Sequence, residues 1–224
     1  MKYLKTLNEN INISEIDAIC EKYNIKNYII NEDDSIDVDG DVYLSHKKLK
    51  VLPLKFRKVS GNFDCGYNQL TSLEGGPQSI GGNFHCSHNQ LTSLVGCPQS
   101  VGGDFECNDN NLTSLEGAPQ SVGGILWCDF NNLKNIDYLP KTYKKLNINE
   151  NPISKILDLF TKPEEYGRIS NREDKDLIMD FIDREIIQQD KLLVNRLVEF
   201  LDDIGKPKSR EELIELLKND YDIH

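Results

Sequence analysis

Two histidines and two carboxylates with a shared spacing are the residues best suited to acid–base or metal chemistry. His85 and His88 are followed by Glu106 and Asp109, 21 residues further along in the same relative places. Imidazole and carboxylate groups ligate transition metals and act as general acids and bases. The sequence adds no nucleophile motif, no phosphate-binding glycine loop and no His-Glu-x-x-His pattern. We therefore expect these four residues to contact a partner rather than to catalyse a reaction.

A row of cysteines with the same spacing raises the question of a metal site. In a parallel stack such cysteines form a row, whereas zinc requires convergent tetrahedral ligands, and a disulfide requires closer Cβ atoms. Cysteine is also among the most often buried residue types. We interpret the row as part of the core, together with Cys97, and expect no metal and no cofactor. The row consists of Cys65, Cys86, Cys107 and Cys128.

These side chains must be positioned by a repeat of 21 residues. Each unit places an apolar residue, a cysteine, an asparagine and two further apolar residues at fixed offsets. The segments 68–73 and 89–94 are identical, which chance does not explain. Four full units begin at Phe63, Phe84, Phe105 and Leu126, and two degenerate units flank them at Val42 and Leu146.

Alternation within each unit predicts a short strand. Phe84 and Cys86 would point inward, while His85 and Ser87 would point outward. Asn89 would turn the chain, and its amide would satisfy backbone groups of neighbouring turns. Glycine pairs and prolines predict a back side of turns or extended chain rather than helix. Because one turn cannot bury its apolar face alone, the units must stack into a solenoid with parallel strands.

The unit, apolar-x-Cys-x-x-Asn-x-Leu-x-x-Leu, resembles the leucine-rich repeat. Its length is similar to the repeat of secreted bacterial effectors, and segments such as Gly-Asp-Phe-x-Cys and Ser-Val-Gly-Gly look most like leucine-rich-repeat proteins encoded by bacteriophages. The resemblance implies an α/β solenoid and a bacteriophage source, but no activity. The ubiquitin-ligase domain of some effectors is not implied, because no cysteine follows Cys128.

The chain is expected to have three parts. Residues 1–39 would form a cap, residues 40–158 the leucine-rich-repeat solenoid of about six coils, and residues 159–224 a small helical bundle. The cap would contain a helix from Glu15 to Tyr23, N-capped by Ser14, and a hairpin with strands at 28–30 and 35–38.

Three amphipathic helices are expected in the C-terminal part. Apolar periodicity predicts helices over 176–188 and 192–204, the second ending at Gly205. A capping box, Ser209 to Glu212, predicts the start of the third. The bundle would cap the solenoid, or serve as a second binding module or dimer contact.

The outward positions of the repeat vary while the inward ones do not, which is typical of a binding face. They hold the chain's single tryptophan among other aromatic residues, histidines and carboxylates, and exposed aromatics are common binding anchors. A merely solvated face is the alternative. We predict a partner-binding site on the concave repeat face that comprises Asp64, Tyr67, His85, His88, Glu106, Asp109, Trp127 and Phe130.

Charge limits the class of partner. The net charge is −11, and no lysine or arginine lies between Val59 and Leu133. Such an acidic surface disfavours nucleic acid and anionic membranes, and favours a protein with a basic or polar surface. No stretch approaches the ~20 apolar residues of a membrane span, and residues 1–10 lack the apolar core of a secretory signal. We therefore expect a cytoplasmic location, that of a bacterial host if the protein is phage-encoded.

These features predict a non-enzymatic protein-interaction module. The bacteriophage resemblance suggests an inhibitor of a host defence protein. One alternative is a structural component, for instance of a virion, assembled through the helical domain. Another is an enzyme with a site where the repeats meet that domain. The oligomeric state is left open.

Overall fold

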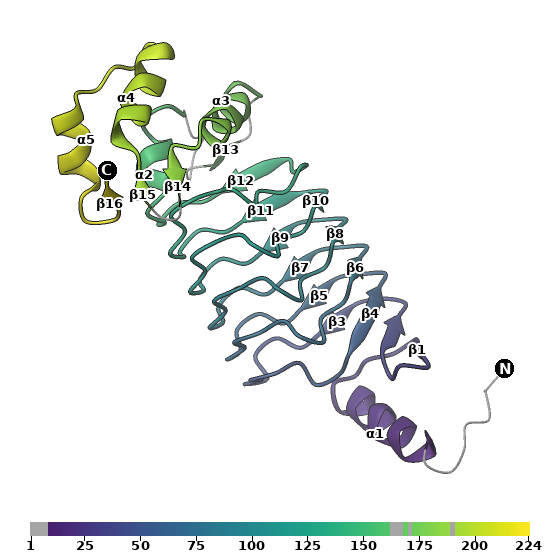
Figure 1. Ribbon diagram of the computed structural model, residues 1–224. Helices are drawn as coiled ribbons and strands as arrows, with labels where there is room; N and C mark the ends of the chain where they lie inside the picture. The colour runs from purple at the N-terminus through teal and green to yellow at the C-terminus, as the bar shows by residue number, and fades with distance from the viewer. Residues whose placement is uncertain (1–8, 162–167, 170–171, 189–190) are drawn as a thin grey trace.

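The computed structural model describes residues 9–161, 168–169, 172–188 and 191–224. These residues form a parallel-strand β-solenoid of about five turns with helices at both ends. In Figure 1 the chain runs from helix α1 (Glu9–Lys22) at one end of the stack to the C-terminal helices at the other. The predicted parallel-strand solenoid is therefore confirmed, with about five turns where about six coils were expected.

A front sheet carries the outward positions that the sequence singled out. Its strands come from successive turns and pair in parallel with a 21-residue offset, so that Phe63 lies opposite Phe84, whereas the offset of the last parallel pair, Leu126 and Leu146, is 20 residues. The last strand is antiparallel and closes the C-terminal edge. In spatial order the strands are β3 (Val42–Tyr43), β5 (Phe63–Asp64), β7 (Phe84–His85), β9 (Phe105–Glu106), β11 (Ile125–Trp127), β12 (Lys145–Asn147) and β13 (Arg168–Ile169).

A back sheet lies on the opposite side of each turn, so the back is extended chain, as predicted. Adjacent turns approach closely here. A Cβ on Gly102 would lie 2.1 Å from the carbonyl oxygen of Gly81, which explains why these positions are glycine. The strands, in order, are β1 (Tyr28–Ile30), β2 (Ile36–Val38), β4 (Phe56–Val59), β6 (Ser79–Ile80), β8 (Ser100–Val101) and β10 (Ser121–Val122).

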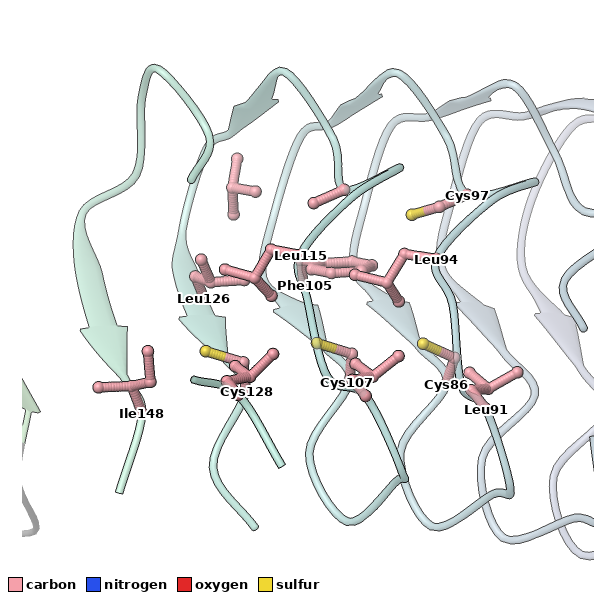
Figure 2. Packing of buried hydrophobic residues seen from close by; sticks show 14 of the residues in the cluster. Cys86, Leu91, Leu94, Cys97, Phe105, Cys107, Leu115, Leu126, Cys128 and Ile148 are labelled. Carbon is pink, nitrogen blue, oxygen red and sulfur yellow. The ribbon is translucent and has the colours of Figure 1, made fainter. Parts of the chain in front are cut away.

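The core between the sheets consists of stacked, identical positions. Phe84 stacks on Phe63 and on Phe105, with ring centroids 5.5 and 5.7 Å apart. Figure 2 shows Cys86, Cys107 and Cys128 as a row, one to each turn. All six cysteines of the chain are buried free thiols. Burial raises the pKa of each thiol in the row, so they stay protonated and pack as small apolar groups.

An asparagine ladder holds the turns together, as the sequence predicted. In the turn of Asn131, Oδ1 accepts a hydrogen bond from the backbone N–H of Leu112 at 3.0 Å. Its Nδ2 donates to the carbonyl of Cys107 in the preceding turn and to that of Cys128 in its own. Each amide thus satisfies buried backbone groups of two turns. The same pattern recurs at Asn68, Asn89, Asn110 and Asn151.

The N-terminal cap differs from the prediction in its helix. Helix α1 begins at Glu9, so Ser14 lies within the helix and is not its N-cap. The hairpin is confirmed, since β1 and β2 pair antiparallel. Strand β2 then pairs in parallel with β4, so the hairpin continues the back sheet beyond the first turn.

The C-terminal part is not the purely helical bundle that was predicted. Helix α3 spans Arg172–Asp183 rather than 176–188, and residues 187–188 form a strand instead. That strand, β14 (Ile187–Gln188), pairs with β15 (Lys191–Leu192), and β15 pairs with β16 (Asp222–Ile223). Apolar periodicity did not reveal the small sheet, because a two-residue strand is too short to show alternation.

The other predicted helices are confirmed within a few residues. Helix α4 spans Val194–Asp203 and is followed by its C-cap residue Ile204 and then by Gly205, which has a φ of +73°. Helix α5 spans Arg210–Leu217 and starts at the predicted capping box, in which Ser209 and Glu212 exchange hydrogen bonds.

This C-terminal part packs on the last turn of the solenoid. A short helix, α2 (Ser154–Leu157), leads into a cluster in which Phe160 contacts Phe181 and Phe200. The hydroxyl of Tyr221 donates to the carbonyl of Lys134, 87 residues earlier. The apolar end of the stack is thereby covered. No helix in the described ranges is long and apolar enough to cross a membrane.

Candidate functional site

All eight residues of the predicted site lie on the outward face of the front sheet. This outward face has three columns that run across the turns, and the middle one consists of Gly66, Ser87, Asn108, Asp129 and Asn149. The first column runs from Asp64 through His85 and Glu106 to Trp127, paired in register. The last column holds Tyr67, His88, Asp109 and Phe130, each directly before a ladder asparagine.

The first column contains a histidine between two carboxylates. Nδ1 of His85 lies 3.0 Å from Oδ1 of Asp64, and Nε2 lies 4.0 Å from Oε2 of Glu106. Burial disfavours the imidazolium, but the hydrogen bond to Asp64 and the two negative charges outweigh it and raise the pKa of His85. Burial raises the pKa of Glu106. Nε2 of His85 also contacts the hydroxyl of Ser87.

The last column has an unusual backbone. Its six residues, one per turn, all have φ between 52 and 57°, in the left-handed region that favours glycine or asparagine. None is glycine or asparagine. A non-glycine residue in this region costs roughly 1–2 kcal/mol. The column comprises His46, Tyr67, His88, Asp109, Phe130 and Glu150.

Rings in the last column stack across three turns. Tyr67 lies between His46 and His88, with ring centroids 4.5 and 4.1 Å apart and nearly parallel planes. His88 continues to the next turn, where its Nε2 lies 3.5 Å from Oδ2 of Asp109. Phe130 extends the column and is 53% exposed. His46 was not predicted as a site residue, because its unit has a lysine where the others have asparagine.

The middle column contains a buried carboxylate that the sequence did not distinguish. Asp129 is only 9% exposed, and its Oδ1 has no hydrogen-bond partner. Burial raises its pKa, and the charges of Asp109 and Glu106 add to the effect. On the next strand Asn147, opposite Trp127, is 5% exposed, and its Oδ1 also lacks a partner. Sequence gives no signal for such burial, because it depends on neighbouring turns.

Within the described ranges no group of three or more histidine, cysteine or carboxylate residues could hold a metal ion. A hollow of about 640 Å³ lies where the repeats meet the C-terminal part, away from the eight residues, and is lined by Asp137, Ile182, Glu185, Ile187, Gln188 and Lys191.

Comparison of the chain with protein-family models, with curated proteins and with solved structures finds no match. Its function must therefore be inferred from the geometry and charge of its own surfaces.

Proposed function

We propose that the protein is a non-enzymatic interaction module that binds a protein partner on the outward face. The observation that carries this proposal is the last column, where six left-handed positions all carry side chains other than glycine, although glycine would fit the backbone better. The backbone conformation alone favours glycine there. Side chains such as Tyr67 and Phe130, 45% and 53% exposed, are of the kind that anchor protein interfaces.

The charge of the face defines the surface that it would bind. Asp64, Glu106, Asp109 and Asp129 lie on it, and no lysine or arginine occurs between Val59 and Leu133. Such a surface attracts and orients a basic partner and repels nucleic acid. The partner would present a basic or polar surface.

The repeat type and the biological setting are a second part of the proposal. The asparagine ladder and the 21-residue spacing support a solenoid of the leucine-rich-repeat type. Together with the resemblance to bacteriophage proteins, this repeat type leads us to propose that the partner is a bacterial host protein. The solenoid protein would then act as an inhibitor of host defence.

A pull-down from bacterial lysate, read by mass spectrometry, tests the proposal. Wild type is compared with the triple variant His85/Glu106/Trp127→Ala. The matched control is Gln78/Gln99/Gln120→Ala, three exposed residues of the back sheet side. We expect one protein to be captured by wild type and the control but not by the triple variant. Equal capture by all three would remove the outward face from the interaction.

Self-assembly would point to the structural alternative. If no lysate protein is captured and the protein forms multimers in sedimentation experiments, the interaction-module proposal fails. Variants at Lys155 and Asp220, which form an ion pair between the solenoid end and the C-terminal part, would then test whether assembly depends on that part.

A further inference from the structure

Two buried acceptor oxygens on the outward face lack donors. Oδ1 of Asp129 and Oδ1 of Asn147 are covered, and neither accepts a hydrogen bond. Buried polar atoms are almost always satisfied, so an orphan acceptor calls for an explanation such as a bound donor. Asp129 follows strand β11 by two residues and Asn147 ends strand β12, and the two turns are joined next to them by a hydrogen bond of 2.9 Å from the N–H of Cys128 to the carbonyl of Asn147.

Burial and neighbouring carboxylates dominate the surroundings of Asp129, although the backbone N–H of Asp129 and the nearby His88 partly offset them. The charges of Asp109 and Glu106 act on its carboxyl group, and the N–H of Asp109 donates to the Asp129 carbonyl at 3.1 Å. Burial and these carboxylates together make the charged form of Asp129 costly. A cation that bound here would remove both penalties, since it supplies donors and opposite charge.

The aromatic neighbours favour a particular kind of cation. Trp127 and Phe130 flank Asp129 along the chain, and Trp127 pairs in register with both Glu106 and Asn147. A guanidinium group has five donors and no acceptor, binds carboxylates through two parallel hydrogen bonds, and stacks on aromatic rings. An ammonium group is a compact, strongly hydrated charge that matches this set less well.

We infer that Asp129, with Glu106, Asp109 and Asn147 around it, forms a subsite for an arginine side chain of the protein partner. This inference rests on the proposed function and names the chemistry of the partner at one place. Because Oδ1 of Asp129 is covered, a rotation of its side chain accompanies binding.

The single tryptophan makes the subsite measurable without the natural partner. A tetra-arginine peptide with blocked ends is titrated into the full-length protein at low salt, and the fluorescence of Trp127 is followed. A tetra-lysine peptide of the same charge is the parallel probe. The variants are Asp129→Asn and Glu106→Gln, and the matched control is Glu116→Gln, an exposed glutamate outside the face. Each variant removes one negative charge.

We expect saturable binding of the arginine peptide, with an affinity that Asp129→Asn lowers about tenfold or more. Glu106→Gln should also lower this affinity. Glu116→Gln should lower it by less than about twofold, because it removes a screened surface charge. Asp129→Asn should melt no lower than wild type, because it removes a desolvated charge. If the Asp129→Asn variant does not fold, the effect of Glu106→Gln on binding of the arginine peptide tests the subsite instead. The subsite would be overturned if Glu106→Gln and Glu116→Gln lowered the affinity for the arginine peptide equally. It would also be overturned if wild type bound the lysine peptide as tightly as the arginine peptide.

The pull-down separates failure of the subsite from failure of the proposed function. If the partner is lost by the His85/Glu106/Trp127 triple variant but retained by Asp129→Asn, the face binds a partner and the arginine subsite is wrong. If the triple variant captures the partner as well as wild type does, the proposed function is wrong. Binding of the arginine peptide would not by itself support the proposed function in that case.

Discussion

His85 and Asp64, which lie 21 residues apart in sequence, form a hydrogen-bonded pair across two adjacent turns. Their Nδ1 and Oδ1 atoms are 3.0 Å apart, and both side chains are less than one quarter exposed. Register creates the pair, because Asp64 and His85 are Cα partners in parallel strands. The outward face is thus a set of cross-strand interactions rather than independent side chains.

This pair predicts that His85 contributes stability in a defined pH range. The folded pKa of His85 lies above its ordinary value of 6.5. Its contribution is therefore fully present below about pH 6.5 and is lost as pH rises through the folded pKa. The melting temperature of wild type relative to His85→Gln should therefore fall as the pH is raised above 6.5. In an Asp64→Asn background the pH dependence of this difference should shrink, and a wild-type advantage that grows with pH would contradict the assignment.

Removing one rung of the asparagine ladder should destabilise the solenoid strongly. In Asn131→Ala, the N–H of Leu112 and the carbonyl of Cys107 lose a buried partner. Each unsatisfied buried group costs roughly 1–3 kcal/mol, so we expect a loss of about 3 kcal/mol or more in urea unfolding. The exposed neighbour Asn132 provides the control, because its replacement by alanine should change the free energy of unfolding by less than about 0.5 kcal/mol. Similar losses in both variants would mean that the amide is not structural.

A methyl group on the back side should disrupt stacking. The Cβ of Gly102→Ala would lie 2.1 Å from the carbonyl oxygen of Gly81, and backbone on adjacent turns cannot move aside independently. We expect a loss of about 2 kcal/mol or more, measured by urea unfolding. Ser100→Ala, an exposed position in the same strand β8, should be nearly neutral. A variant as stable as wild type would show that the turns are spaced more widely than described.

Substitutions of Phe130, which has a left-handed backbone conformation, should affect stability and partner binding differently. Phe130 has a φ of 52° and is 53% exposed. Phe130→Gly relieves the backbone, whereas Phe130→Ala does not, so the glycine variant should be more stable than the alanine variant by about 1 kcal/mol in thermal unfolding. Both should weaken capture of the partner equally. A glycine variant less stable than the alanine variant would mean that this position is not strained.

Much of the fold could be predicted because the repeat is a local signal. The offsets of Phe84, Cys86, Asn89, Leu91 and Leu94 recur in each unit, and they determine which side chains point inward. Once strands stack in parallel with the observed 21-residue offset, the eight residues of the outward face must form columns. Their placement on one face is therefore a consequence of the period.

The terminal elements were less predictable, for physical reasons. The strands β14 and β16 depend on pairing with β15 rather than on periodicity. Strand β16 pairs in parallel with β15, some 30 residues earlier in the chain. Short strands of this kind are specified by partners distant in sequence.

The sequence by itself determined the period, the inward and outward assignment, and the acidic character of the face. Only the tertiary structure decided which outward groups are covered. Asp129 and Asp109 are both aspartates in outward columns, yet one is 9% exposed and lacks a donor at Oδ1, while the other contacts His88. The physical reason is that desolvation depends on side chains contributed by adjacent turns and by the capping part, which no single unit encodes.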